Sequence, residues 1–353
     1  WVNHHRRGGW QHIDDCTFPA GKYKVLEGAK VSKITITNVA VWGLGNHAIN
    51  RILPALASID GVKLVGVCSR NRKVVEECAK QWKCHGWISP SEMLNCDNVD
   101  VVYISTPIGI HFSLSEQALK AGKHVWCEKP LTCDYEETKF LVSLAEKFNK
   151  GLTESFMYLH HSQFLRVKQF IDESKQVHSV ICRFGIPALA NPGFRNEPKL
   201  CGGALWDVAS YTVSAVLALF PYQKVDILFS EVQQKEDSPV DTEGRVLLRF
   251  SRGATAYLEW GVGVAYKNEL DVWAENGSLF TDKIFSKPKD YKPKYYLSDL
   301  NGNVSVEHGE QSEQFVQMFH NFVELIGDEQ KIAAERAVIL QRAKLMDDIV
   351  NFG

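Results

Sequence analysis

Hydrophobic residues in the first part of the chain form short β-type runs that alternate with segments of helical spacing. The β-type runs are Ile34–Trp42, Lys63–Cys68, Asp100–Ile104 and Lys123–Cys127, and the clearest helical segments are Arg72–Trp82 and Tyr135–Phe148. Such alternation over about 120 residues predicts a doubly wound parallel sheet with helices on both faces. We therefore expect an α/β domain over residues 32–151.

The pattern changes after Gly151, where several strands follow one another without helices between them. The expected strands are Thr153–Phe156, Ser179–Ile186, Lys224–Phe229, Arg245–Phe250, Thr255–Trp260 and Glu269–Ala274, and the expected helices include Ser162–Glu173, Glu313–Leu325 and Glu329–Val350. Consecutive strands favour a mixed or antiparallel open sheet covered by helices on one face. We therefore expect a second, α+β domain over residues 152–353, with a role in substrate binding and oligomerisation.

Residues 1–31 show no period that assigns an element, and we treat them as an N-terminal extension. His4, His5 and His12 lie there without the Cys/His spacing of a zinc finger. A surface arm or an interface segment fits this composition better than a metal site, and we predict no metal centre in the chain.

Composition excludes several classes of protein. The chain has 353 residues, 45% of them hydrophobic, and a net charge of −2, which does not favour a nucleic acid or an anionic membrane as partner. No apolar run reaches the roughly 18 residues that a membrane span requires. The nine cysteines are odd in number and scattered, so we expect a reducing, cytoplasmic location with most thiols acting as small buried hydrophobes.

The segment Gly43-Leu44-Gly45-Asn46-His47-Ala48 has the form G-x-G-x-x-A between a predicted strand and a predicted helix. Glycines at these places allow a tight turn and the close approach of a pyrophosphate to a helix N-terminus. In this strand-turn-helix context the motif predicts a dinucleotide site in a Rossmann domain.

The end of the second strand bears on the choice between NAD and NADP. Ser69 and Arg70 stand where NAD-specific proteins commonly carry a carboxylate. A hydroxyl and a guanidinium favour a 2′-phosphate, so we predict NADP, with NAD as the alternative. The segment also suits a solvated helix start capped by Ser69 or Asn71, and both interpretations can hold together.

A lysine lies at the end of the fourth predicted strand, in the segment KHVWCEKP (Lys123–Pro130). Open α/β sheets bind ligands at the carboxyl ends of their strands, so Lys129 is well placed for chemistry, although a solvated lysine before a turn is the alternative. Further along, Asp207 and Tyr211 are four residues apart on an apolar helix and should share a face. A packed core tyrosine is the alternative for Tyr211.

These motifs, taken in order, resemble the glucose-fructose oxidoreductase / inositol dehydrogenase (Gfo/Idh/MocA) family. The resemblance rests on GLGNHA, STPIGIH (Ser105–His111), CEKP and CGGALWDVASY (Cys201–Tyr211), and it covers the chain from about Thr35 to its end. Within the family, ESFMYLHH (Glu154–His161), FRNEP (Phe194–Pro198) and the stretch Tyr266–Phe285 look most similar to sugar-nucleotide 3-ketoreductases.

The resemblance implies roles for individual residues. Lys129 would be the active-site lysine, with a cis Lys129-Pro130 bond and Glu128 beside the cofactor. Thr106, Pro107 and His111 would flank the nicotinamide ribose. Tyr211 stands where many members have histidine, which implies a tyrosine as proton donor and a lowered tyrosine pKa beside the Lys129 ammonium. The implied substrate contacts are Lys129, Tyr158, His160, Arg195, Asp207 and Tyr211, with His161 a further possibility.

The expected activity is that of an NAD(P)-dependent oxidoreductase that transfers hydride between nicotinamide and a carbonyl or secondary alcohol of a sugar or sugar nucleotide. A trans-dihydrodiol or simple-sugar dehydrogenase is the alternative within enzymes, and a catalytically inactive NAD(P)-binding regulator is the alternative of another class. We expect a homodimer or homotetramer, because the second sheet has helices for only one face.

Overall fold

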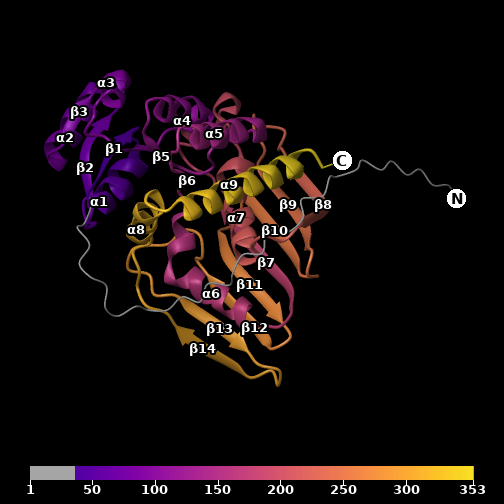
Figure 1. The fold of residues 1–353 in the computed structure, drawn as a ribbon. Coiled ribbons are helices and arrows are strands. Elements are labelled where there is room, and N and C mark those ends of the chain that lie inside the picture. The colour runs from indigo at the N-terminus through magenta and orange to yellow at the C-terminus, as the bar shows by residue number, and fades with distance from the viewer. Residues whose placement is uncertain (1–35, 353) are drawn as a thin grey trace, which may run out of the picture. The chain divides into compact units, whose positions relative to one another are not determined.

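The computed structural model describes residues 36–352. The N-terminal extension over residues 1–31, with its three histidines and Cys16, lies outside the described residues. The described part contains two sheets and the helices that pack on them (Figure 1).

The first sheet has six parallel strands in the order β3-β2-β1-β4-β5-β6. Its strands are β1 (Thr37–Trp42), β2 (Val62–Cys68), β3 (His85–Trp87), β4 (Val101–Ile104), β5 (His124–Cys127) and β6 (Leu152–Glu154). The strand order reverses between β1 and β4, and this is where doubly wound sheets bind ligands. The predicted α/β fold of the first part is confirmed.

Helices cover both faces of this sheet. They are α1 (Leu53–Leu56), which continues a π-helical turn at Ala48–Ile52, α2 (Arg72–Trp82), α3 (Pro90–Leu94), α4 (His111–Lys120) and α5 (Tyr135–Lys147). Separate apolar cores form on the two faces, one with α4 and α5 and the other with α1 and α2. The central strands are apolar on both faces because both are covered: Val39, Ala40 and Val41 are fully buried.

The second sheet has eight strands in the order β14-β13-β12-β11-β7-β10-β9-β8. The strands are β7 (Val177–Ile186), β8 (Val225–Gln233), β9 (Glu243–Phe250), β10 (Thr255–Val262), β11 (Lys267–Ala274), β12 (Gly277–Asp282), β13 (Lys294–Ser298) and β14 (Val304–His308). β7 and β10 are parallel and the other neighbours are antiparallel. The predicted mixed sheet is therefore confirmed.

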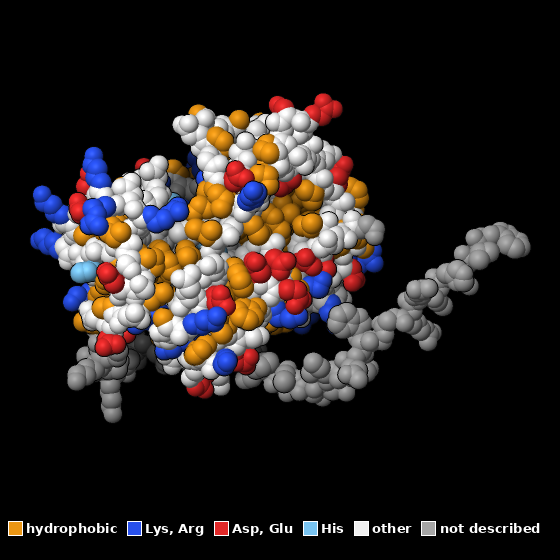
Figure 2. Space-filling view, turned by 90° about the horizontal axis from the view of Figure 1, so that it is seen from above, with side chains coloured by type: hydrophobic (Ala, Val, Ile, Leu, Met, Phe, Trp, Pro, Cys, Tyr) orange, Lys and Arg blue, Asp and Glu red, His pale blue; other side chains and the backbone are white. Residues whose placement is uncertain are grey.

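One face of this sheet is buried under α6 (Ser162–Glu173), α7 (Ser210–Leu219) and α9 (Glu329–Val350). The opposite face carries ion pairs, such as Arg183 with Glu259 and Glu269, beside exposed aromatic side chains such as Trp273. The uncovered face is thus more polar than the apolar surface that we expected. Seen from above, the surface of the molecule carries charges of both signs beside apolar patches (Figure 2).

Two elements from the segment that we expected to form the second domain belong with the first sheet. β6 begins at Leu152, after the expected end of the first domain, yet it pairs with β5 as the sixth parallel strand. The helix α8 (Gln314–Ile326) inserts Phe315, Met318, Phe319 and Phe322 into the core that contains β1 and α1. The chain therefore returns to its first sheet after building the second.

One segment, Pro198–Leu219, is long and apolar enough to cross a membrane, but 67% of its most apolar window is buried inside the protein. It contains α7, which lies against β7 and β10 in the core of the second sheet. Burial against these strands accounts for its apolar composition.

Candidate active site

The turn after β1 has the geometry that its glycines predict. Gly43 has φ +106°, and a Cβ there would lie 2.2 Å from the carbonyl oxygen of Ser105, so only glycine fits. A Cβ on Gly45 would meet nothing within 4 Å, which leaves open space in front of the following helix. Ala48 is fully buried against the sheet. The turn thus has room for a phosphate group at a helix N-terminus.

The other residues of this turn differ in their surroundings. Leu44 packs against the apolar core, whereas Asn46 and His47 are exposed. The Nε2 atom of His47 lies 2.9 Å from Oε1 of Glu128, at the end of β5. This contact links the dinucleotide turn to the strand that carries Lys129.

At the end of β2 the structure has a capped helix start preceded by an exposed arginine. The Asn71 side chain caps α2 by accepting from the Val74 amide at 3.4 Å, and Ser69 Oγ accepts from the Asn71 amide at 3.3 Å. Arg70 is exposed and forms no ion pair with a described residue. Its guanidinium is therefore accessible to a phosphate.

The loop after β4 leads to His111, which the resemblance places beside the nicotinamide ribose and which is buried between two loops in the structure. His111 is fully buried, and its Nδ1 and Nε2 atoms each lie 2.9 Å from a carbonyl oxygen, of Pro130 and Thr106 respectively. Burial lowers the pKa of His111 although both carbonyls oppose this. Its ring braces two loops and does not reach into the site. Pro107 is half-buried at the start of the next turn.

Thr106 offers a group that a ligand can use. Its Oγ1 atom is buried and has no hydrogen-bond partner among the described residues. Buried hydroxyls are normally hydrogen-bonded, so an unpaired one beside a dinucleotide turn fits a site that receives a polar ligand group.

Glu128 is held between the turn and the lysine. Its Oε1 atom accepts a hydrogen bond from the Tyr103 hydroxyl at 2.6 Å as well as contacting His47. Burial alone would raise the pKa of Glu128, but His47, the Tyr103 hydroxyl and Lys129 together lower it. Glu128 therefore carries a negative charge next to the dinucleotide turn.

Lys129 joins the two halves of the described chain. The Lys129-Pro130 bond is cis, as the resemblance implied. The Nζ atom donates to the backbone oxygen of Asp207 at 2.7 Å and to its Oδ1 at 2.9 Å, while Arg195 Nε donates to Asp207 Oδ2 at 2.6 Å. Lys129 thus meets three candidate residues from a later part of the sequence, namely Arg195, Asp207 and Tyr211.

The charges of this cluster stabilise one another. Burial opposes the ionisation of Asp207, but Lys129 and Arg195 overcome it and lower the pKa of Asp207 to about 2. Burial also opposes the charge on Lys129, but Asp207 outweighs it and the pKa of Lys129 is raised. The lysine is therefore an ammonium and the aspartate a carboxylate at neutral pH.

Tyr211 differs from our expectation in its acidity. The Lys129 Nζ atom lies 4.3 Å from the centroid of the Tyr211 ring and donates its hydrogen bonds to Asp207. Burial raises the pKa of Tyr211 more than Lys129 lowers it, so the expected lowering was wrong. The Tyr211 hydroxyl donates to Met157 Sδ at 4.0 Å. The phenol is therefore protonated at neutral pH and suited to donate a proton.

The helix that carries these residues starts with an irregular turn. Leu205–Ala209 is π-helical and α7 follows directly, so Asp207 and Tyr211 still face Lys129 as expected from their spacing. Asp241 accepts from the Leu205 amide at 2.7 Å and so caps this start, and burial raises the pKa of Asp241 to about 6. Asp241 could not be found from a local pattern, because it lies in a polar loop 36 residues after Leu205.

Three residues proposed as substrate contacts or proton donors lie elsewhere. Tyr158 is fully buried, and its hydroxyl bonds to Ser214 Oγ at 2.6 Å and to the Tyr211 carbonyl at 3.0 Å. His160 Nδ1 accepts a hydrogen bond from the side-chain amide of Asn321, on α8, at 2.8 Å. His161 is buried and caps α6, because its Nδ1 accepts from the Gln163 amide. Burial lowers the pKa of His160 to about 4 and that of His161 to about 3. Tyr158 therefore packs against Tyr211, whereas His160 and His161 contact α8 and α6 and are uncharged at neutral pH.

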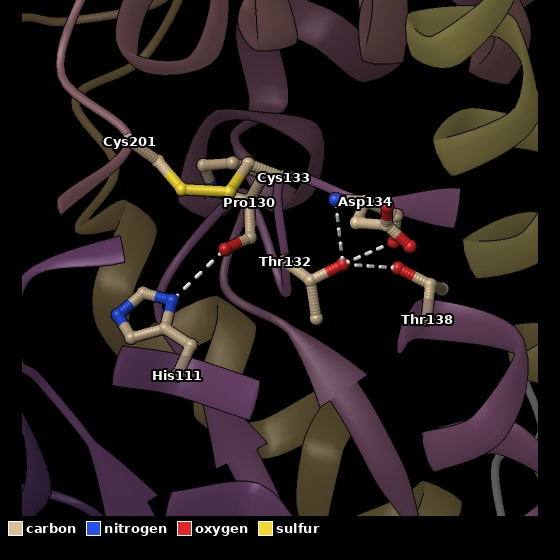
Figure 3. The surroundings of a disulfide bond; sticks show 7 residues. All are labelled: His111, Pro130, Thr132, Cys133, Asp134, Thr138 and Cys201. Atoms are coloured by element: carbon tan, nitrogen blue, oxygen red, sulfur yellow. Dashed lines mark hydrogen bonds between the residues drawn. A yellow bond between two sulfur atoms is a disulfide. The ribbon is translucent and has the colours of Figure 1, made fainter. Parts of the chain in front are cut away.

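Arg195 reaches Asp207 from an exposed loop, residues 187–201, in which no residue is buried. The loop is fastened by a disulfide between Cys133 and Cys201, whose Cα atoms are 6.3 Å apart (Figure 3). The backbone at Cys133 is held in place, because the buried hydroxyl of the preceding residue, Thr132, forms a hydrogen bond with the Thr138 hydroxyl at 2.6 Å. This pair differs from the free thiols that a reducing compartment implies, because the two cysteines become neighbours only in the fold. Of the other described cysteines, four are buried and two half-buried.

The cluster combines a neutral phenol, an ammonium, a guanidinium and a carboxylate at the carboxyl ends of the parallel strands. Within residues 36–352 there is no group of three His, Cys, Asp or Glu side chains that could hold a metal ion. The arrangement suits proton transfer to an oxygen atom whose negative charge is stabilised by nearby cations.

Comparison with known proteins agrees with this chemistry. The family model described as "Oxidoreductase family, NAD-binding Rossmann fold" matches residues 37–156, and the "GFO/IDH/MocA C-terminal domain" matches residues 164–280. The chain is 30% identical over 256 residues to dTDP-3,4-didehydro-2,6-dideoxy-alpha-D-glucose 3-reductase of Saccharopolyspora spinosa, which covers 72% of this chain and 77% of that protein. It is also 30% identical to D-xylose 1-dehydrogenase (NADP(+)) 2 of Haloferax volcanii, over 71% of this chain and 77% of that protein.

Solved structures show the same similarity. The structure of KijD10, a 3-ketoreductase from Actinomadura kijaniata in complex with NADP and TDP-benzene, superimposes with a TM-score of 0.82 at 26% sequence identity. The match covers 90% of this chain and 97% of that one.

Proposed function

Because the chain belongs to the GFO/IDH/MocA family of oxidoreductases, we propose that it is an NADP-dependent reductase of a ketone on a nucleotide-linked sugar. The observation that carries this proposal is the cluster of Lys129, Arg195, Asp207 and Tyr211 beside the dinucleotide turn. A binding protein without turnover has no need for an ammonium, a carboxylate and a protonated phenol at this place, which argues against an inactive regulator.

The residues present fit a dinucleotide. Gly45 leaves space at the helix N-terminus, Thr106 Oγ1 is unpaired, and the exposed Arg70 suits a 2′-phosphate. NADPH, when bound, would supply the hydride for the ketone carbon. Solved structures of KijD10 with NADP support the choice of cofactor.

The chain's own residues then handle one proton and the charge. Tyr211 donates its phenolic proton to the ketone oxygen, and its raised pKa keeps that proton in place at neutral pH. Lys129 provides positive charge near the same oxygen, and Asp207 keeps the ammonium both charged and oriented.

Arg195 is our candidate for binding the substrate. Only its Nε is used by Asp207, no hydrogen bond from its Nη groups to a described residue is present, and the side chain is 39% exposed. A guanidinium in this state suits phosphate oxygens or sugar hydroxyls. The names of the relatives and the TDP-benzene complex of KijD10 support a nucleotide-linked substrate.

The test is the oxidation of NADPH by the purified protein with a panel of carbonyl compounds, followed by absorbance. The panel contains a dTDP-linked 3-keto-deoxysugar, the same sugar without the nucleotide, and a simple aldose assayed in the oxidative direction with NADP. We expect the highest kcat/KM for the nucleotide-linked ketone and its loss in Tyr211→Phe. Turnover of free sugars alone would reject the nucleotide requirement, and tight NADPH binding without any turnover would favour a regulator.

A simple-sugar dehydrogenase is the second candidate, because the chain is also 30% identical to the Haloferax D-xylose 1-dehydrogenase. A trans-dihydrodiol as substrate remains a prediction, which is tested by adding a trans-dihydrodiol with NADP to the same panel. A cytoplasmic location and a dimer or tetramer formed through the uncovered face of the second sheet also remain predictions.

A further inference from the structure

A buried ion pair lies directly behind the active-site cluster. Glu154 at the end of β6 and Arg342 on α9 are 7% and 5% exposed, and Arg342 Nη1 donates to Glu154 Oε2. The other carboxylate oxygen, Oε1, accepts from the Leu131 amide at 2.7 Å. Leu131 is two residues after Lys129, so Glu154 fixes the backbone from which the lysine projects.

The same guanidinium also supports Tyr211. Its carbon atom lies 4.5 Å from the centroid of the Phe156 ring, which is fully buried. Phe156 in turn meets the Tyr211 ring edge-on, with centroids 5.9 Å apart and an interplanar angle of 90°. Arg342 is therefore connected to Lys129 through Glu154 and the Leu131 amide. It is connected to Tyr211 through the ring of Phe156.

The surroundings of the pair are polar where a packing role alone would favour apolar side chains. Arg342 and Ser210, the residue before Tyr211, line a cavity of about 10 Å³, which is about the size of one water molecule. Arg342 Nε and Ser210 Oγ are buried and have no hydrogen-bond partner among the described residues. A buried ion pair contributes little net stability compared with apolar residues of similar volume.

We propose that Glu154 and Arg342 are positioning residues that set the distance between Lys129 and Tyr211. They do not touch the reacting atoms. Through the single guanidinium of Arg342 they fix both the backbone near Lys129 and the ring of Tyr211. The Lys129 ammonium thereby lies 4.3 Å from the centroid of the Tyr211 ring. As a statement about catalysis this inference rests on the proposed function, but its geometric part can be tested without a substrate.

The variants are chosen to separate positioning from stability. Glu154→Gln keeps an acceptor for the Leu131 amide, whereas Glu154→Ala removes it. Arg342→Met leaves Glu154 buried without its partner, and the double variant Glu154→Leu/Arg342→Met removes both charges so that neither remains unpaired. The matched control is Arg336→Met on the same helix, because Arg336 donates to the Lys150 carbonyl at 3.0 Å and contacts none of the cluster.

In kinetic assays we expect kcat to fall about 10- to 100-fold in Glu154→Ala and in Arg342→Met, since misplacement by about 1 Å can cost that much. The dissociation constant of NADPH should change less than about twofold, and Glu154→Gln should recover part of the kcat. The double variant should regain most of the thermal midpoint that Arg342→Met loses, short of the wild type because the Leu131 amide lacks its acceptor, but it should not regain the kcat. Recovery of kcat together with stability, or a loss in Arg336→Met equal to that in Arg342→Met, would overturn the proposal.

A crystal structure of the double variant gives a readout that does not depend on turnover. We expect the Lys129 Nζ atom to move relative to the Tyr211 ring and to Asp207. An unchanged arrangement of Lys129, Asp207 and Tyr211 would overturn the positioning role. If the wild type reduces no sugar at all, the proposed function fails, and this structural comparison still decides the inference.

Discussion

Replacing Asp207 by asparagine tests the charge balance of the cluster. The carboxylate accepts from Lys129 at 2.9 Å and from Arg195 at 2.6 Å, and its side chain is only 12% exposed. Asparagine keeps the size and one acceptor but removes the negative charge. The substitution therefore leaves the 9% exposed Lys129 ammonium with an incomplete partner.

The expected magnitude follows from the acidity of the group. The pKa of Asp207 is about 2 in the folded protein against 3.8 as its ordinary value. Each unit of difference corresponds to about 1.4 kcal/mol, so the ionised carboxylate stabilises the folded state by roughly 2 kcal/mol at neutral pH. Because the folded pKa is the lower one, this contribution is present above pH 3.8 and is lost as the pH falls towards about 2.

The assay is urea unfolding of the wild type and Asp207→Asn from pH 7 down to about pH 3. We expect the variant to be less stable by roughly 2 kcal/mol at pH 7, and the difference to shrink below about pH 4. The control is Asp172→Asn, whose carboxylate pairs with Lys168 on the surface of α6 at 2.8 Å and should matter by less than about 0.5 kcal/mol. A difference that is the same at every pH, or no larger than in the control, would refute the electrostatic account.

Four other predictions follow from the site and the fold. Lys129→Ala and Tyr211→Phe should each lower kcat by about 100-fold or more, with less than additive effects in the double variant. Because burial raises the pKa of Tyr211, the alkaline loss of wild-type activity should begin only above the ordinary range of a tyrosine. Full turnover in Tyr211→Phe would exclude the tyrosine as proton donor. NADPH should bind at least about tenfold more tightly than NADH, with Arg70→Ala reducing the preference, and equal dissociation constants would contradict this. Reduction of the disulfide by a dithiol should speed proteolysis within residues 187–201, since none of them is buried, and a Cys133→Ser/Cys201→Ser variant cleaved as slowly as the oxidised wild type would argue against the disulfide as an anchor. Sedimentation should show a dimer or tetramer, because Trp273, Phe229 and Tyr296 are 62%, 44% and 40% exposed on the uncovered sheet face; a monomer at high micromolar concentration would oppose this.

Local sequence patterns were sufficient to predict several elements of this fold. The strand, turn and helix around Gly43 and Gly45 were predicted because a few neighbouring residues fix such a turn. The helices Ser162–Glu173 and Glu329–Val350 have the predicted bounds, since the residues that cap them and break them lie at their ends. The position of Lys129 at the end of a parallel strand was likewise a local inference from the proline that follows it.

Only the tertiary structure decided which of these residues are buried and which distant segments contact one another. The sequence could not show that His111 and Tyr158 are fully buried, because both belong to motifs that resemble binding segments. Nor could it show that burial outweighs Lys129 in setting the pKa of Tyr211, since that balance depends on how much water the surrounding rings exclude. The pairing of Cys133 with Cys201 and of Glu154 with Arg342 joins residues 68 and 188 positions apart. Local periodicity carries no information about such pairs, because they exist only once the two sheets and the C-terminal helix have packed together.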